Sequence, residues 1–223
     1  MKRFLTLFVL AFALVSCGAS KFYVGNASST TPVALVEPYT YLTDAIADFQ
    51  TDYVQDVSVA NQTLLKEIVS ALGVPVAKLV PFEYFPTDRS DFINGWMRSF
   101  RDLTPAAASG LEIPGEIRDA VANSGCRYGM ILVDLGYVKN AKQYALERGV
   151  ETGLNVMNFI VNGELNLSHD SEAFMNGVYS VIFDNQSGEV VWFGKRHPDY
   201  KHNPLDRGDM TDQLRKLYKD FLK

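Results

Sequence analysis

The sequence predicts an α/β (α+β) domain in which a single mixed, largely antiparallel sheet is packed with helices. Three observations predict this fold class. Some segments carry apolar residues at helical spacing, others are apolar runs or alternating stretches bounded by turn residues, and the two kinds follow one another along the chain. The periodic segments begin at residue 33, so a single domain is expected over residues 33–223.

The first part of this domain is predicted to hold two strands with one helix between them. Val33–Val36 is a short apolar run that indicates a buried strand. A helix is expected from Asn61, as its N-cap, up to Gly73, because the apolar side chains between them fall on one face. Residues 74–82 then indicate an edge strand, since their two prolines each lack a backbone donor.

Two further helices are predicted before the centre of the chain. One opens at Ser90 and carries an apolar stripe as far as Phe100, after which Thr104–Gly110 breaks the chain. The next starts at Pro114, because proline is favoured in the first turn of a helix, and it stops around Gly125.

The second part of the domain is predicted to be mostly strand. Tyr128–Val138 is a near-continuous apolar run, which is typical of a strand covered on both faces. Residues 155–167 alternate between apolar and polar and indicate a strand with one solvated face. Val178–Phe183 and Glu189–Gly194 are expected to pair as a hairpin, because the residues between them favour a turn. A final amphipathic helix is expected to be capped by Thr211.

The first residues of the chain have the pattern of a signal peptide. A basic start at residues 2–3 precedes an apolar run at residues 4–15, and small residues precede Cys17. Leu14–Cys17 resembles the lipobox of bacterial lipoproteins. The resemblance implies that signal peptidase II cleaves before Cys17, and that this cysteine then carries a diacylglycerol and an acylated amine.

This interpretation divides the N-terminal region into a signal peptide at residues 1–16 and a lipidated cysteine with a flexible tether at residues 17–32. In enterobacterial lipoproteins an aspartate after the lipidated cysteine favours the inner membrane. By similarity to that sorting rule, Gly18 implies an anchor in the outer membrane, facing the periplasm. A plain secretory signal and a retained membrane helix are the alternatives. A spanning helix needs ~20 apolar residues, and this run breaks at Cys17.

Composition and charge narrow the classes of function. The chain is 47% apolar and 21% charged, as in an ordinary globular protein. Its net charge of −5, without a basic run, argues against nucleic acid and anionic lipid headgroups as partners. The only cysteines are Cys17 and Cys126, and Cys126 is expected to be a small core residue rather than a nucleophile or redox thiol.

No motif for catalysis, for a cofactor or for a metal is recognisable in the sequence. His169 lies in a stretch that indicates a surface loop, and the spacing of His197 and His202 matches no zinc signature. Several acids could include a catalytic pair, but no spacing singles one out: Asp88, Asp91, Glu112, Glu116, Asp119 and Glu172. We therefore expect no cofactor, no metal and no enzymatic activity.

Three segments also carry a family pattern. They are the opening strand with its capped helix, the Gly125–Val133 lead into an apolar strand, and a Val181–Trp192 hairpin that contains Asp-x-x-Ser-Gly-Glu-x-x-Trp. Together they resemble envelope lipoproteins related to the TolB amino-terminal domain and to the curli-secretion channel lipoprotein CsgG. The resemblance implies a non-enzymatic, membrane-tethered envelope protein. The chain departs from the channel former, because only residues 155–167 alternate over the length of a membrane strand.

Four aromatic residues form the candidate binding surface: Phe82, Tyr84, Phe85 and Trp96. Exposed aromatic side chains mark recognition sites, whereas buried ones would pack a strand end under a helix, and both interpretations stay open. The main hypothesis is a membrane-anchored periplasmic lipoprotein that binds or helps to assemble another envelope protein. The alternatives are a lipid-anchored hydrolase and a ring-forming secretion component, for which the chain would be a homo-oligomer.

Overall fold

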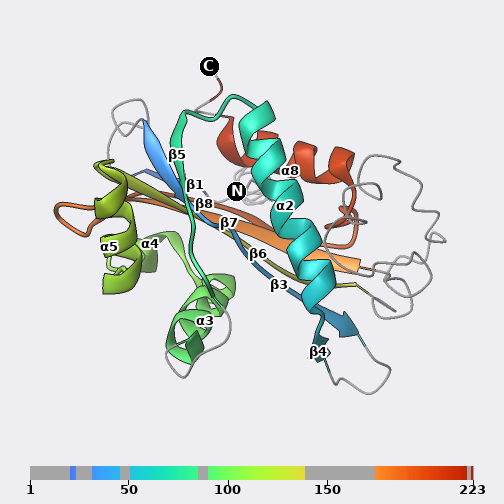
Figure 1. Cartoon of the computed structure of the whole chain (residues 1–223). Coiled ribbons are helices and arrows are strands. Elements are labelled where there is room, and N and C mark those ends of the chain that lie inside the picture. Colours follow the sequence, from blue (N-terminus) through green and yellow to red (C-terminus); the bar gives the residue numbers. More distant parts are fainter. Residues whose placement is uncertain are drawn as a thin grey trace, which may run out of the picture.

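The computed structural model of the chain describes residues 21–23, 32–45, 51–84, 90–138, 174–219 and 222. Figure 1 shows three layers, with the sheet between two groups of helices. The strands are β1 (Lys21–Tyr23), β2 (Val33–Val36), β3 (Tyr39–Ala45), β4 (Thr51–Tyr53), β5 (Val76–Val80), β6 (Tyr128–Val138), β7 (Phe174–Asp184) and β8 (Val190–Asp199). The helices are α2 (Gln55–Ala71), α3 (Ser90–Arg98), the 3-10 turn η2 (Ser99–Asp102), α4 (Pro105–Ala108), α5 (Gly115–Ser124) and α8 (Arg207–Tyr218).

The eight described strands form one mixed sheet, which confirms the predicted fold class. Its strand order is β1-β8-β7-β6-β2-β5, and β3 follows β2 along the same edge of β6 and also pairs with β4. The pairs that β2 makes with β5 and β6, and that β3 makes with β6, are parallel. The remaining pairs are antiparallel, including the long pairs of β7 with β6 and β8.

The core consists of two apolar clusters, one on each face of the sheet. Helices α2 and α8 cover one face, and α3, α4 and α5 cover the other (Figure 1). Successive residues of β6 serve the two clusters in turn: Met130 and Leu132 face α2 and α8, whereas Ile131 and Val133 face α3 to α5. The near-continuous apolar run of β6 is therefore explained, because a strand in the middle layer buries both faces.

Several predicted boundaries are confirmed by the structure. Strand β6 spans the predicted residues, and α3 begins at Ser90. Helix α5 ends at Ser124 and is capped by Gly125, whose φ of 77° is a left-handed conformation that glycine adopts without strain. The predicted hairpin is formed by β7 and β8, which are longer than the predicted strands. Residues 155–167, predicted as a strand, lie outside the described residues, as does the predicted signal peptide with Cys17.

The start of α2 differs from the prediction. The helix begins at Gln55, six residues before Asn61, and Asn61 is buried within it rather than capping it. The apolar stripe continues through Val57 and Ala60, but the buried Ser58 and the exposed Val59 between them blur it in the sequence. Asn61 is tolerated inside the helix because its side-chain amide donates hydrogen bonds to groups outside α2.

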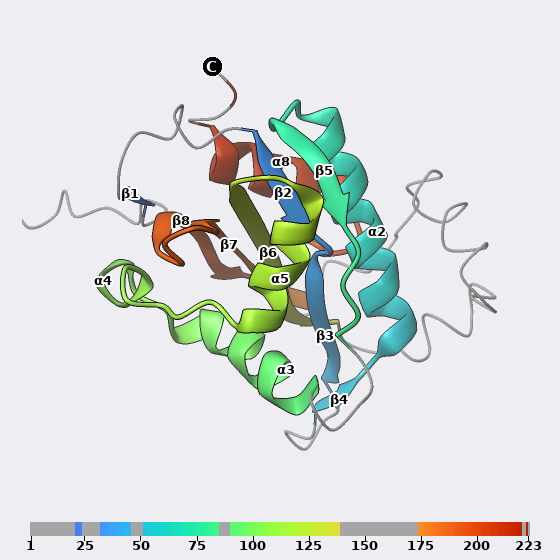
Figure 2. The same cartoon turned by 60° about the vertical axis from the view of Figure 1, so that its left-hand side comes forward.

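Part of the predicted tether is also corrected by the structure. Lys21–Tyr23, within the residues predicted to be flexible, form β1 and pair antiparallel with β8. Figure 2 shows β1 at one edge of the sheet, beside β8, with β5 at the opposite edge. Among the described residues, no helix has the length and the apolar character that crossing a membrane requires.

The N-cap of α8 is Asp206 rather than Thr211, which lies inside the helix and donates to the carbonyl of Arg207. The Asp206 carboxylate accepts a hydrogen bond of 2.8 Å from the backbone amide of Asp209. We predict that Asp206→Ala lowers the free energy of unfolding by about 1 kcal/mol, because an amide of the first turn loses its acceptor. Thr211→Ala should change the free energy of unfolding by only about a few tenths of a kcal/mol. Chemical denaturation of both variants measures the two changes. Equal losses would contradict the capping assignment.

Candidate functional site

A cleft of about 350 Å³ opens beside the N-terminal half of α2. Four segments meet there: the turn between β2 and β3 with the start of β3, the end of β4, the outer face of α2, and residues 81–84 after β5. The lining residues are Glu37, Tyr39, Thr40, Tyr53, Gln55, Val59, Gln62, Pro81, Phe82, Glu83 and Tyr84. Segments distant in the sequence thus converge on one concave site.

Aromatic rings form much of the wall of this cleft. Tyr84 is buried, its ring stands edge-on to Tyr39 at 5.0 Å, and its hydroxyl donates to the carbonyl of Glu37 at 2.5 Å. Burial, followed by the nearby Glu37 charge, raises the pKa of Tyr84 well above its ordinary value. The half-buried Phe82 lies 4.9 Å from the Tyr84 ring. Tyr84 therefore fixes the wall, and Phe82 is the more accessible of the two.

Tyr53 closes the other side of the cleft and is half-buried. Its ring stacks on Tyr41 at 5.1 Å, and the guanidinium of Arg98 lies 5.1 Å above the centre of the Tyr41 ring. Burial is the main reason that the pKa of Tyr53 is raised. Stacking holds the Tyr53 ring in one orientation, so that it offers a rigid surface to a ligand.

Some of the charged and amide groups of the cleft are engaged in contacts with other residues of the chain. The carboxylate of Glu37 pairs with Lys66 at 2.5 Å, and the amide of Gln62 donates to the carbonyl of Pro38 at 2.8 Å. Glu83 lines the cleft and is exposed, and Val59 exposes 42% of its surface. The arrangement offers apolar and aromatic contact with a few polar groups, which is the chemistry of a recognition site.

The structure divides the predicted aromatic surface. Phe82 and Tyr84 line the cleft, whereas Phe85 lies outside the described residues. Trp96 belongs to α3 and is not among the lining residues; it is half-buried and stands edge-on to Phe100 at 5.0 Å. The sequence did not single out Tyr53 or Val59. Tyr53 lies in a stretch without clear periodicity, and Val59 lies in the first turns of α2, which precede the predicted start of the helix.

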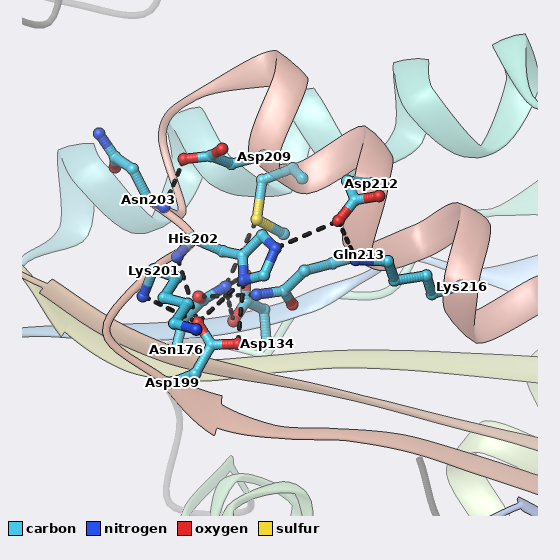
Figure 3. A network of polar contacts seen from close by, with 11 residues as sticks. Asp134, Asn176, Asp199, Lys201, His202, Asn203, Asp209, Asp212, Gln213 and Lys216 are labelled. Atoms are coloured by element: carbon cyan, nitrogen blue, oxygen red, sulfur yellow. Dashed lines mark hydrogen bonds and ion pairs between the residues drawn. The ribbon is translucent and has the colours of Figure 1, made fainter. Parts of the chain in front are cut away.

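A second polar cluster lies inside the domain, between β6, β7, α2 and α8 (Figure 3). Its centre is Asp134, which is fully buried in the middle of β6. The carboxylate of Asp134 accepts from the side-chain amides of Asn61 at 3.0 Å and Asn176 at 3.3 Å. Gln213 of α8 donates to the side-chain oxygen of Asn176 at 3.2 Å. The cluster thus joins the sheet to both helices that cover this face.

Burial raises the pKa of Asp134 to about 7, although the amide groups of Asn176 and Asn61 favour its charged form and lower the pKa. Its side-chain partners are neutral amides rather than cations. Within the described residues, two buried acceptors of this cluster, Asn61 Oδ1 and Gln213 Oε1, have no hydrogen-bond partner. In the sequence, the one indication of this cluster is an aspartate, Asp134, within an otherwise apolar run.

The loop after β8 holds His202 between two carboxylates. Its Nδ1 lies 2.9 Å from Asp199, and its Nε2 lies 3.2 Å from Asp212, which also pairs with Lys216 (Figure 3). Burial alone would raise the pKa of Asp199, but hydrogen bonds from His202 and the Lys201 amide keep it below its ordinary value. Both ring nitrogens are engaged, so His202 ties the loop to α8. His197 is exposed at the end of β8.

The remaining candidate residues do not gather into a site among the residues that the structure describes. Glu112, Glu116 and Asp119 are exposed around α5, while Asp88, His169 and Glu172 lie outside the described residues, as does the side chain of Asp91. No group of three or more histidine, cysteine or acidic residues in the described ranges is arranged to hold a metal ion. Cys126 is half-buried and packs against the cluster under α3 to α5.

Comparisons with known proteins identify no family. No family model matches the chain, and no curated protein matches it. Among solved structures, a PelC dodecamer from Paraburkholderia phytofirmans is 13% identical, with a TM-score of 0.38, and the match covers 91% of this chain and 95% of that one. A single-substitution variant of that dodecamer is 11% identical, with a TM-score of 0.36, and the match covers 91% and 96%. Both TM-scores lie below 0.5, so neither likeness supports a conclusion about function.

Proposed function

We propose that this protein is a lipoprotein of the bacterial envelope, anchored in the outer membrane by a lipid on Cys17, that binds another envelope protein through the cleft beside α2. The cleft is the observation on which the binding function rests, because Tyr53 and Phe82 line it next to the exposed Val59. Aromatic side chains held in place at a partly open site often dominate the energy of a protein interface. The lipobox at Leu14–Cys17 supports the anchor.

The polar groups of the cleft favour binding over catalysis. A general acid or base needs a titratable group that is free to meet the substrate. Here Lys66 engages the Glu37 carboxylate, and the Tyr84 hydroxyl is buried and donates to a backbone carbonyl. These groups shape the walls, while the accessible surfaces are ring faces, the Val59 side chain and the single exposed carboxylate of Glu83.

Photo-crosslinking in cells tests this function. We expect a photoreactive residue at position 59 to form an adduct of one defined mass with an envelope protein. The same residue at position 92 should form none, although Phe92 exposes 67% of its surface, because it lies on α3 and outside the cleft. Turnover of peptide, glycan or ester substrates by the purified protein, abolished by one substitution in the cleft, would favour the hydrolase hypothesis instead.

A second substitution makes the test specific for the cleft. Phe82→Ala should reduce the position-59 adduct by about tenfold or more, as truncation of an interface aromatic does. Trp96→Ala is the matched control, because Trp96 is also a half-buried aromatic but lies outside the cleft. It should keep the adduct, and thermal unfolding of both variants would show whether their stability losses are similar. An adduct that survives Phe82→Ala unchanged would contradict the assignment of the cleft.

A further inference from the structure

The start of β1 lies only a few residues after the position that the lipid would occupy. Lys21 begins β1 and pairs with Gly194 of β8, at the edge of the sheet seen in Figure 2. Four peptide bonds separate Cys17 from Lys21 in the sequence. An extended chain advances at most about 3.6 Å per residue, so the Cα atoms of Cys17 and Lys21 are no more than about 14 Å apart. A lipid on Cys17 would therefore hold this edge of the sheet close to the bilayer.

The direction of the pairing shows which part of β8 lies nearest to the anchor. Because β1 and β8 are antiparallel, the chain preceding Lys21 and the chain following Gly194 start from the same end of the paired segment. Beyond Gly194 come Arg196, His197, Tyr200 and Lys201. His197 and Lys201 are exposed, and Tyr200 exposes 52% of its surface. The end of β8 thus presents cationic and aromatic side chains on the anchor side.

The local charge of this segment is opposite to that of the whole chain. The sequence has a net charge of −5, whereas residues 195–201 carry Lys195, Arg196 and Lys201. Partial burial, then the charges of Lys195 and Arg196, lower the pKa of His197. Lys195 itself is buried, and its ammonium donates to the Leu103 carbonyl at 3.0 Å.

The acid in this segment is engaged by groups of its own loop. The Asp199 carboxylate accepts from the backbone amide of Lys201 at 3.0 Å and lies 2.9 Å from Nδ1 of His202. These contacts partly offset its negative charge. Besides the buried Lys195, the cations of this segment are the exposed Lys201 and the half-buried Arg196, whose Nε is buried without a hydrogen-bond partner among the described residues. The overall acidity of the chain argues against anionic headgroups as partners, but residues 195–201 bring cationic side chains close together on the anchor side.

We propose that the end of β8 and the turn that follows it, with the side chains of Arg196, His197, Tyr200 and Lys201, dock on the anionic headgroups of the membrane that holds the lipid. This inference rests on the lipid anchor of the proposed function. Cations near an anionic bilayer are attracted to it, and tyrosine rings favour the headgroup region. The cleft is lined by β3, which lies beyond β7 and β6 in the sheet and so about 14 Å from β8. Docking would leave the cleft open to a protein partner.

Hydrogen exchange of the lipidated protein on vesicles tests this surface. The vesicles contain either phosphatidylethanolamine with phosphatidylglycerol or phosphatidylcholine alone. We expect the amides of residues 195–201 to exchange several-fold more slowly on the anionic vesicles, and those of residues 76–80 on the opposite edge to exchange equally on both. Equal exchange of residues 195–201 on the two vesicles would overturn the proposed surface.

Charge variants show whether the cations cause the docking. Each cation near an anionic surface shifts the docked-to-undocked ratio by roughly fivefold, so Arg196→Gln/Lys201→Gln should lower it by about 25-fold and abolish the protection. The control variant Lys78→Gln/Arg98→Gln removes one exposed cation from β5 and one from α3, and it should keep the protection of residues 195–201. Protection that survives Arg196→Gln/Lys201→Gln would contradict electrostatic docking.

The intact mass of the same protein preparation tests the lipid anchor independently of the docking surface. An intact mass without acyl groups would refute the lipid anchor, not the surface. In that case residues 17–223 of a Cys126→Ser variant would be coupled through the Cys17 thiol to a maleimide-bearing lipid, and the vesicle comparison would decide the surface. A lipidated protein without protection at residues 195–201 would refute the surface and leave the proposed function standing.

Discussion

The free energy of unfolding of this protein is expected to fall, relative to that of an Asp134→Asn variant, as the pH rises from about 4 to about 8. The pKa of Asp134 is about 7 in the fold against 3.8 for an ordinary aspartate. Below the ordinary pKa, the carboxyl is neutral in both the folded and the unfolded chain. Above the ordinary pKa, the carboxyl loses its proton in the unfolded chain but keeps it in the fold. The free energy of unfolding therefore falls with rising pH until the pH exceeds the pKa of Asp134 in the fold. The full difference is on the order of 4 kcal/mol.

Urea denaturation of both proteins across this pH range measures the effect. Asp184→Asn is the control, because hydrogen bonds from Arg127, at 2.6 Å and 2.9 Å, lower the pKa of Asp184 instead. The stabilisation by Asp184 is present above the ordinary aspartate pKa and is lost only in acid, so this variant should parallel the natural chain between pH 5 and about pH 8. If the stability of Asp134→Asn followed that of the natural chain in parallel over this pH range, the placement of Asp134 as a buried carboxylate without a cationic partner would be wrong.

Gly136→Ala is expected to destabilise the fold by about 3 kcal/mol or more. A Cβ atom at Gly136 would lie 2.2 Å from the carbonyl oxygen of Met175 and 2.8 Å from the Cα of Asn176. Both atoms belong to the backbone of β7, so no side-chain rotation relieves the clash and the two central strands must move apart. Gly136 also pairs with Asn176, the residue whose amide contacts Asp134. The substitution should therefore disturb the buried polar cluster as well.

Thermal and chemical unfolding of Gly136→Ala would measure this loss, with Gly95→Ala as the control. Gly95 is exposed on α3, and a Cβ there meets nothing within 4 Å. Alanine is the better helix former, so Gly95→Ala should stabilise the protein slightly, by up to about 1 kcal/mol. If Gly136→Ala unfolded with the same midpoint as the natural chain, the close approach of β6 and β7 at this position would be wrong.

The elements with the strongest local patterns could be predicted from the sequence. Strand β6 is covered on both faces, so its apolar run is unbroken enough to reveal its length. Gly125 marks the end of α5, because few other residues adopt a positive φ without strain. The hairpin of β7 and β8 follows from the turn residues between Asp184 and Gly188.

Features that depend on tertiary contacts could not be predicted in the same way. The start of α2 is hidden because Asn61 looks like a cap in the sequence, while in the fold its amide satisfies Asp134. Thr211 and Asp206 are both good N-caps by residue type, and only the path of the chain decides between them. The edge strand β1 gains its partner from β8, about 170 residues away, so nothing local distinguishes it from a tether.

The candidate cleft was only partly accessible to sequence reasoning. Phe82 and Tyr84 stand out as aromatics between prolines, and both line the cleft. Tyr53 and Val59 come from the region around the start of α2, and their role depends on how α2 packs beside residues 81–84. A concave site made of four segments has no signature in any one of them, so the opposite wall becomes visible only in the fold.

Mass spectrometry of the intact protein, extracted from the membranes of its own cells after brief crosslinking, tests the proposed function most directly. We predict a chain of residues 17–223 that carries the mass of a diacylglycerol and an acyl group, together with an adduct to one envelope protein. The adduct should be lost in the Phe82→Ala variant and kept in Trp96→Ala. An unlipidated chain with a free thiol at Cys17 and no adduct would contradict both the anchor and the binding function.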